Sequence, residues 1–204
     1  MNSDEVRRQW ADRTGEYSPE YYAYHGPNDT SEAVRAALDR YVDRTDPVLE
    51  LGCSSGRHLA HLQDHGFEDL AGIEVNDEAV AVMAHTYPAL ATGATLHTGT
   101  IEDVAPGFAD GQFGAVFSVE TLQHLHPDSA WVFPELARIA DGVLVTVENE
   151  GDPSKSGDPP VSYVNDEFPL YHRDWGEVFT DLGLEEVAAR PGDRDTMRVF
   201  RVPG

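Results

Sequence analysis

The chain has 204 residues, a formal net charge of −23 from 37 acidic and 14 basic residues, and one cysteine, Cys53. A single cysteine excludes an intramolecular disulfide, and the length suits one domain whose core needs no covalent staples. The acidity argues against a nucleic-acid partner, because phosphate contacts need clustered Lys and Arg, and the only such cluster is Arg7-Arg8.

Lysine is almost absent, because Lys155 is the only one among the 14 basic residues. This balance resembles the adaptation of salt-in halophiles, in which surface carboxylates keep a protein hydrated and salt screens their repulsion. A halophilic source is therefore expected. No apolar run is long enough to span a membrane and no signal-peptide pattern begins the chain, so we expect a cytoplasmic protein.

The N-terminal segment combines an expected helix with an aromatic cluster. Residues 3–13 predict a helix with Val6 and Trp10 four apart on one face. Residues 17–27 then hold four tyrosines and a histidine. These rings either pack on the first helix or form a lid over a small-molecule pocket, since a ring with a polar tip suits a pocket wall. The substrate-binding candidates in this segment are Tyr21, Tyr24 and His25.

A second helix is expected over residues 29–43. Asp29 or Thr30 would be its N-cap, with Glu32 three residues after Asp29. Its apolar positions repeat at helical spacing, which predicts one buried face. This helix would lead directly into the most specific stretch of the chain.

Residues 48–59 carry that specific signal. Pro47 breaks the preceding helix, a short apolar run suits a buried strand, and Gly52 and Gly56 precede a new helical pattern. Such a βα unit brings backbone N–H groups close to a ligand. Ser54 and Arg57 stand where the dinucleotide fingerprint Gly-x-Gly-x-x-Gly needs glycine, which disfavours an NAD-dependent oxidoreductase.

What does fit is an acidic residue, Glu50, followed by small residues and the two glycines. Here the chain resembles motif I of the class I S-adenosylmethionine (SAM) dependent methyltransferases, E/D-x-G-x-G-x-G. It departs at the middle glycine, where Ser54 should pass close to the methionine end of the cofactor. The resemblance implies SAM as cofactor and assigns to it Glu50, Gly52, Cys53, Ser54, Gly56 and Arg57. Cys53 is interpreted as a small turn residue, with a catalytic thiol as the lesser alternative.

Three histidines lie on the helix expected after motif I, which should end at His65-Gly66. His58, His61 and His65 are spaced at i, i+3 and i+7. Metal ligation by His61 and His65 is formally possible. A solvated polar helix face is favoured, because no cysteine or carboxylate motif joins them, and no metal is expected.

The second strand is expected over residues 69–76 and ends at Glu74, about 20 residues past the glycine turn. A carboxylate at that distance can accept both hydroxyl hydrogens of a ribose. Glu74 matches the acidic motif II residue of the methyltransferases, with Val75 beside it at the cofactor. The alternative is a strand-end carboxylate without a ligand. A helix capped by Asn76 or Asp77 should follow.

The third strand, at about 94–97, leads into the loop 99–104. In the resembled family this loop carries an acidic or polar side chain that binds the adenine amino group, with an apolar neighbour against the ring. Glu102 and Ile101 match these roles. A loop with surface acids is the alternative in so acidic a chain.

The fourth strand, at 111–120, leads into residues 121–127, which look like the family's "FD-x-V…HL" region with Gly114 in place of Asp. The resemblance places the end of this strand near the transferable methyl. Ser118 and Val119 would then contact the cofactor, and the catalytic candidates are Glu120, His124 and His126. His124 suits a general base by its ordinary pKa, and a structural role is equally supported. No D/N-P-P-Y/F motif occurs, which argues against DNA and protein-glutamine amino methyltransferases.

The remaining chain predicts a helix, a strand, a long polar loop, a helix and two strands. The expected ranges are 128–140, 143–147, 148–169, 170–182, 184–190 and 196–202. A loop as long as 148–169 is usually functional, so we expect it over the acceptor. The acceptor-binding candidates in this part of the chain are Asn149, Tyr163 and Tyr171.

The expected fold is one α/β domain over residues 1–204, with a helical cap segment at 1–45 and a SAM-binding core at 46–204. The resemblance implies a doubly wound, Rossmann-like sheet of seven strands in the order 3-2-1-4-5-7-6, the last strand antiparallel. The expected function is in-line methyl transfer from SAM to a small molecule, in a monomer or homodimer. Alternatives are a protein or RNA acceptor and a SAM-binding module without activity, which Ser54 and Gly114 keep open.

Overall fold

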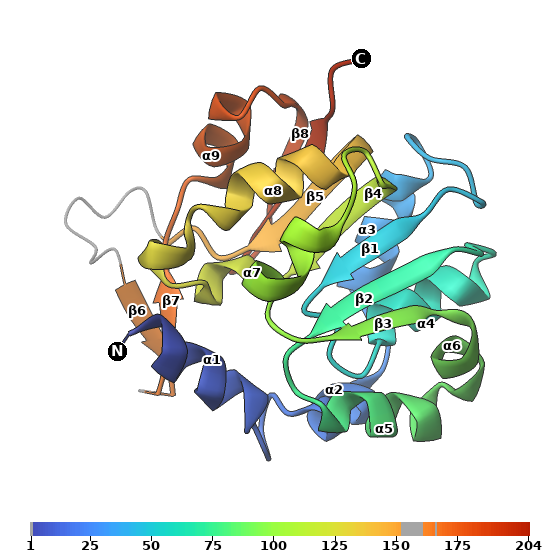
Figure 1. The fold of residues 1–204 in the computed structure, drawn as a ribbon, viewed down its shortest axis with the longest axis vertical. Helices are drawn as coiled ribbons and strands as arrows, with labels where there is room; N and C mark the ends of the chain where they lie inside the picture. The colour runs from blue at the N-terminus through green and yellow to red at the C-terminus, as the bar shows by residue number, and fades with distance from the viewer. Residues whose placement is uncertain (1, 152–160, 166) are drawn as a thin grey trace.

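The computed structural model describes residues 2–151, 161–165 and 167–204, and its centre is a seven-stranded sheet (Figure 1). The strands run in the order β3-β2-β1-β4-β5-β9-β8, and β9 is antiparallel to both of its neighbours. This confirms the predicted doubly wound fold and strand order. The strands are β1 (Val48–Leu51), β2 (Leu70–Glu74), β3 (Thr95–Thr98), β4 (Phe113–Val119), β5 (Ala140–Glu148), β8 (Glu185–Pro191) and β9 (Thr196–Arg201).

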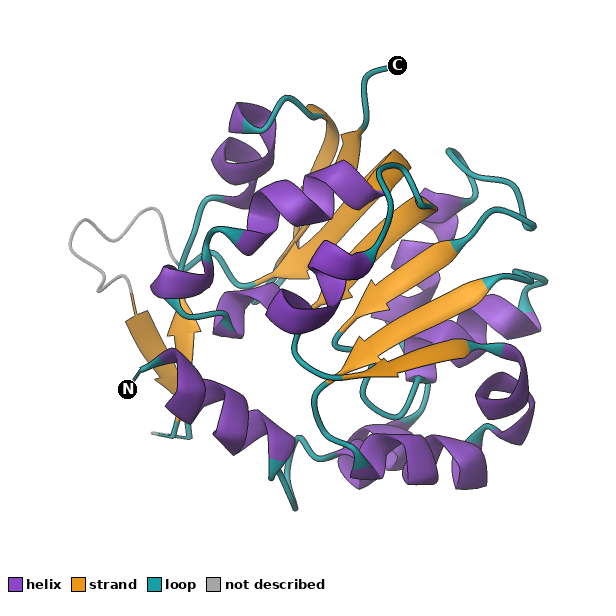
Figure 2. Cartoon of the chain, viewed as in Figure 1, coloured by secondary structure: helices purple, strands orange, loops and turns teal. Residues whose placement is uncertain are grey.

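Helices cover both faces of this sheet (Figures 1 and 2). One face carries α7 (Ile101–Val104), α8 (Val132–Ile139) and α9 (Trp175–Asp181), and the other carries α3 (Asp29–Leu38) and α4 (Arg57–Asp64). The other helices are α1 (Ser3–Ala11), α2 (Pro19–His25), α5 (Glu78–Thr86), α6 (Pro88–Gly93) and the 3₁₀ turns Ala105–Gly107, Leu122–His124 and Pro127–Ser129. Within the described residues, no helix has the length and hydrophobicity needed to cross a membrane.

Alternating side chains of the central strands feed two apolar layers. In β1, Val48 packs with Leu38 and Leu59 beneath α3 and α4, whereas Leu49 packs with Ile139 and Phe179 on the opposite face. All of these side chains are fully buried. Each such burial contributes roughly 1.5–3 kcal/mol. The layers therefore fix the strand ends at which the site forms.

Helix α3 begins and ends earlier than the sequence predicted. Its N-cap is Asn28, not Asp29 or Thr30, because Asn28 accepts a hydrogen bond from the Ser31 N–H (3.1 Å). The Ser31 hydroxyl accepts one from the Asn28 N–H in return (3.0 Å), which completes a capping box. The helix closes at Leu38 and turns follow, so it does not extend to residue 43.

His58 is buried, so the predicted solvated polar face is wrong for this residue. Its Nδ1 lies 2.8 Å from the Ser31 hydroxyl and links α4 to α3. Loss of hydration on burial lowers the pKa of His58 to about 3, so the ring is neutral at physiological pH. The pair satisfies both polar groups inside the helix–helix contact.

The expected helix over 170–182 is wrong in its first part. Strand β7 (Phe168–Tyr171) pairs antiparallel with β6 (Val161–Val164), and α9 begins only at Trp175. Pro169 favours an extended chain, and Asp174 caps the later helix by accepting from the Glu177 N–H (3.0 Å). Part of the predicted loop 148–169 is thus a hairpin. Its residues 152–160 and 166 lie outside the described chain.

Candidate active site

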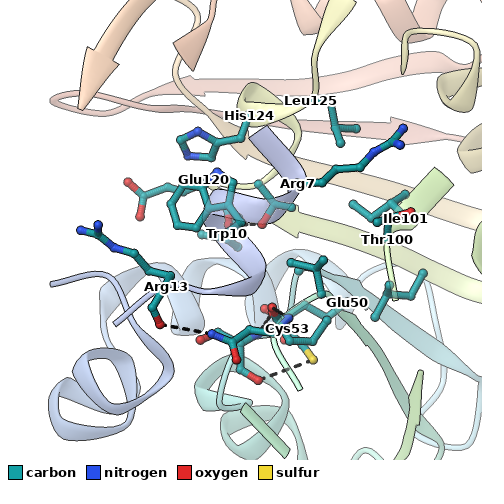
Figure 3. A pocket seen from close by; sticks show the side chains of 18 of the residues that line it. Arg7, Trp10, Arg13, Glu50, Cys53, Thr100, Ile101, Glu120, His124 and Leu125 are labelled. Carbon is teal, nitrogen blue, oxygen red and sulfur yellow. Dashed lines mark hydrogen bonds between the residues drawn. The ribbon is translucent and has the colours of Figure 1, made fainter. Parts of the chain in front are cut away.

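A cavity lies where the carboxyl ends of β1, β2 and β4 meet, and residues of α1 also line it (Figure 3). Its empty space is about 1090 Å³, including open solvent at the mouth. Open α/β sheets bind ligands at this edge, because the loops after parallel strands converge there. The lining of the cavity combines residues from the N-terminal segment with residues that follow four different strands, β1, β2, β3 and β4.

The turn after β1 forms the floor of the cavity. Gly52 and Ser54 both adopt left-handed backbone conformations, with φ of +70° and +48°. A Cβ on Gly52 would lie 2.4 Å from the Thr121 hydroxyl, so glycine is required for the turn to pack against the end of β4. Ser54 holds its conformation at a cost of roughly 1–2 kcal/mol because it carries a side chain. Ser54, which stands where the resembled motif has glycine, thus adopts a left-handed backbone conformation although it carries a side chain.

Glu74 stands at the end of β2 and holds this turn in place. Its Oε2 accepts from the Ser54 N–H (2.7 Å) and its Oε1 from the Asn76 N–H (2.8 Å). Desolvation raises the pKa of Glu74, and the two N–H donors oppose that shift. An ionised carboxylate has about four acceptor positions, so about two remain for a ligand.

Glu50 presents an unsatisfied carboxylate in the floor. The side chain is buried, and Oε2 has no hydrogen-bond partner among the described residues. Burial raises the pKa of Glu50 well above its ordinary value, and the nearby Arg57 partly offsets this. The Arg57 guanidinium itself lies 4.7 Å from the centre of the Tyr22 ring. A buried acceptor without a partner is costly, so this oxygen is suited to a donor group of a ligand.

Ile101 and Glu102 line the cavity next to β2 and are both buried. Glu102 Oε1 accepts from Nε and Nη2 of Arg7, at 3.2 and 3.0 Å. Helix α1 is thereby tied to the loop after β3. Glu102, the residue expected to accept from the adenine amino group, thus already uses Oε1 for the hydrogen bonds from Arg7. Its Oε2 takes part in neither of these bonds.

The end of β4 brings together Glu120, His124 and His126, which all line the cavity. Glu120 has a φ of +49° and forms an ion pair with Arg194. His126 Nδ1 accepts from the Asp128 N–H (3.2 Å), and its ring meets Tyr171 edge-on. Of the three, His124 lies deepest.

His124 is held in one tautomer. Its Nδ1 lies 2.9 Å from the Pro169 carbonyl oxygen and must donate to it, which leaves Nε2 as an acceptor. The side-chain amide nitrogen of Gln123 lies 3.4 Å from this Nε2. Burial lowers the pKa of His124 to about 4, so the ring is neutral at pH 7. The Trp10 ring packs against it, with centroids 4.5 Å apart. His124 is thus a weak base and an oriented hydrogen-bond acceptor.

Glu148 organises the loop after β4 and was not among the predicted site residues. It accepts from the Ser118 hydroxyl (2.5 Å) and from the N–H groups of Thr121, Leu122 and Gln123 (3.2, 3.1 and 3.1 Å). Burial raises the pKa of Glu148 to about 7. An acidic residue at the end of an apolar strand was the only sequence signal for this role.

Helix α1 supplies a wall that sequence reasoning did not assign to the site. Val6, Arg7, Trp10 and Arg13 line the cavity. The Trp10 Nε1–H is buried and has no partner among the described residues, and the Arg13 carbonyl accepts from the Asn76 side chain (3.2 Å). The apolar pair Val6 and Trp10, four residues apart in the sequence, was the signal from which this wall could have been predicted.

Most cofactor candidates line the cavity, namely Glu50, Gly52, Cys53, Ser54, Arg57, Glu74, Val75, Ile101, Glu102 and Val119. Gly56 and Ser118 do not. Gly56 is the left-handed N-cap of α4 and packs on Met83, and Ser118 bonds to Glu148. Burial raises the pKa of Cys53 well above its ordinary value, so its thiol stays protonated and unreactive.

None of the six predicted substrate-binding residues lines the cavity. These residues are Tyr21, Tyr24, His25, Asn149, Tyr163 and Tyr171. Helix α2 instead turns Pro19 and Tyr22 inward, together with Tyr17 before it. Tyr24 is 87% exposed and Tyr163 53% exposed. Asn149 is engaged in a local turn, where its side chain accepts from the Gly151 N–H (2.8 Å).

A comparison with known proteins shows which family the residues around the cavity resemble. Residues 49–145 match the profile of a family described as a methyltransferase domain. This stretch of the chain is therefore similar to a methyltransferase domain. The match runs from β1 into β5 and so includes every strand whose end borders the cavity. No curated protein sequence matches the chain.

Solved structures share the fold of this chain at low sequence identity. A geranyl diphosphate methyltransferase in complex with geranyl diphosphate and sinefungin has a TM-score of 0.78 and 13% identity, covering 98% of this chain and 99% of that chain. A geranyl diphosphate C-methyltransferase from Streptomyces coelicolor A3(2) has a TM-score of 0.75 and 12% identity over 98% of both chains. A SAM-dependent methyltransferase from Mesorhizobium loti has a TM-score of 0.64 and 14% identity, covering 91% of this chain and 99% of that chain.

The buried His124 contributes a pH-dependent part to the stability of this protein. Its pKa is about 4 in the folded protein and 6.5 ordinarily, so only the unfolded chain binds a proton at this residue between these values. The contribution of His124 to the free energy of unfolding therefore falls as pH drops from 6.5 toward 4. We expect His124→Gln to remove about 3 kcal/mol of this acid-induced loss. Denaturant unfolding at neutral and acid pH measures it.

The control for this prediction is His85→Gln, because the His85 side chain is exposed on α5. This variant should keep the wild-type pH dependence. An unchanged acid-induced loss in His124→Gln would contradict the buried neutral state of His124.

Proposed function

We propose that this protein transfers the methyl group of SAM to a small-molecule acceptor held between α1 and the end of β4. The observation that carries the proposal is the two-sided cavity. One side has carboxylate and backbone groups placed for a nucleoside, and the other is an aromatic wall closed by α1. A methyltransferase has to bring two such ligands together in one space.

The cofactor fits the donor and acceptor groups of the floor. Glu74 keeps about two acceptor positions for the two hydroxyls of a ribose. Ile101 would lie against the adenine ring, and Glu102 Oε2 would accept from its amino group. The unpartnered Glu50 oxygen suits a positively charged donor, which is the chemistry of the ammonium group at the methionine end.

The protein's part in the reaction is positioning. The cofactor supplies an already activated methyl group, so the chain has to align the acceptor with it and exclude water. Trp10 and His124 form a rigid aromatic wall at the end of β4. His124 Nε2 would accept a hydrogen bond from an O–H or N–H of the acceptor, in place of the Gln123 amide nitrogen 3.4 Å away, and so orient its nucleophilic atom. With a pKa of about 4, His124 is a weak base and its main work is orientation.

A small acceptor with an apolar or aromatic body suits the enclosure. Helix α1 covers the cavity and contributes Val6 and Trp10, and Leu125 and Tyr22 add apolar surface. A folded RNA or a protein loop would need an open cleft instead. The two geranyl diphosphate methyltransferases similar in fold act on a small molecule, which supports this class of acceptor without identifying it.

Glu74→Gln tests the cofactor assignment. The amide loses the charge and offers one acceptor oxygen. Because a hydrogen bond to a charged group contributes about 1.5–3 kcal/mol, we expect SAM and its demethylated product to bind roughly 10- to 100-fold more weakly. Calorimetry at low and at molar KCl gives the dissociation constants. Glu78→Gln, in the exposed first turn of α5, is the control and should bind as the wild type does.

The outcomes of this calorimetry are distinct. A wild-type protein that binds neither SAM nor its product in either salt would overturn the cofactor assignment. Binding by Glu74→Gln equal to that of the wild type would contradict only the ribose contact.

Trp10→Ala tests the acceptor side of the cavity. We expect methyl transfer to fall at least about tenfold, because an Ala side chain leaves the acceptor and His124 without their wall. The assay follows labelled methyl from SAM into a fractionated metabolite, protein and RNA pool. Trp131→Ala is the matched control, since this ring is 52% exposed outside the cavity.

Label should appear in the small-molecule fraction. Label confined to RNA or protein would contradict the proposed acceptor class. SAM binding with no transfer into any pool would indicate a binding module without activity.

A further inference from the structure

Helices α3 and α4 bring three metal-ligating side chains together outside the lining of the cavity. One ligand atom from each of Glu32, His61 and His65 lies within 4.8 Å of the others. Glu32 is on α3, whereas the two histidines come from α4 and its C-cap. We propose that this cluster binds a divalent transition-metal ion, with Zn²⁺ the best chemical match.

The helix geometry aligns the two imidazoles. His61 and His65 are four residues apart, so their side chains project from one face, and their ring centroids are 4.3 Å apart. His61 Nε2 also lies 3.1 Å from Glu32 Oε2. The sequence alone offered the two histidines, and the fold adds the carboxylate that they lacked.

His65 is already in the tautomer that a metal needs. Its Nδ1 lies 2.7 Å from the His61 carbonyl oxygen and must donate to it, so Nε2 carries the free lone pair. Metal-ligating histidines commonly donate their second N–H to a backbone carbonyl in this way. The orienting contact therefore comes from the helix end itself.

Glu32 is held as a carboxylate by Arg35. The guanidinium donates through Nε to Oε2 (2.8 Å) and through Nη2 to Oε1 (2.5 Å). Oε2 therefore faces His61 as an ionised oxygen. Arg35 orients this oxygen in the way that hydrogen-bond partners outside the ligand shell orient the ligands of metal sites.

The ligand set selects the metal and its role. Two imidazoles and one carboxylate suit Zn²⁺, with a fourth position open to water, whereas Mg²⁺ and Ca²⁺ prefer oxygen ligands. The run His61-Leu62-Gln63-Asp64-His65 lacks the glutamate that follows the first histidine in hydrolytic H-E-x-x-H sites. The ion would therefore be structural and would join α3 to α4, as the Ser31–His58 bond does one turn earlier.

Titration of the tag-free full chain with Zn²⁺ tests the proposal, by calorimetry and by thermal unfolding. We expect one ion per chain and a higher unfolding temperature, because a ligand that binds only the folded state stabilises it. His65→Ala should weaken binding at least about tenfold, the lower bound for loss of an outer-shell partner. His61→Ala and Glu32→Gln should weaken it as well, and Mg²⁺ should give no stabilisation.

His65→Ala is the decisive variant, because the His65 side chain is exposed. His85→Ala removes one exposed histidine from α5 and should leave Zn²⁺ binding unchanged. Failure of the wild type to bind Zn²⁺, or equal binding by His65→Ala, would overturn the proposal. SAM binding plays no part in this readout, so the result is independent of the proposed function.

Discussion

The site depends on the carboxylate of Glu74. It joins the glycine turn after β1 to the end of β2 by accepting from the N–H groups of Ser54 and Asn76. Without that anchor the strained Ser54 backbone would have no compensating contact. The same carboxylate lines the cavity and keeps acceptor positions, which supports the proposed contact with a ribose.

A second constraint closes the cavity from the opposite side. Arg7 reaches Glu102, Trp10 packs on His124 and Phe168, and the Arg13 carbonyl accepts from Asn76. These contacts tie α1 to the loops after β2, β3 and β4 and to the β6–β7 hairpin.

The sequence predicted well what local spacing controls. Glycines after a short apolar strand, with an acid about 20 residues later, are consequences of one βα unit followed by the next strand. The positions of Gly52 and Glu74 could therefore be inferred from residue order, and the strand order followed from the family resemblance that these residues carry. The match at 49–145 lies within this locally determined part.

What the sequence did not yield depends on partners distant along the chain. The apolar pair Val6 and Trp10 announced a buried face, but its partners His124 and Phe168 lie more than 100 residues away. His58 looked solvated because its partner, Ser31, belongs to the preceding helix. The aromatic cluster was correctly noticed, but helical rotation turns Tyr22 inward and Tyr24 outward, which composition cannot decide.

The most direct test of this account is a crystal structure grown with S-adenosylhomocysteine. We expect its ribose hydroxyls on the Glu74 carboxylate, its adenine against Ile101 and its sulfur directed toward the end of β4 near His124. Cofactor density at another place, or a cavity without cofactor at saturating concentration, would contradict the account.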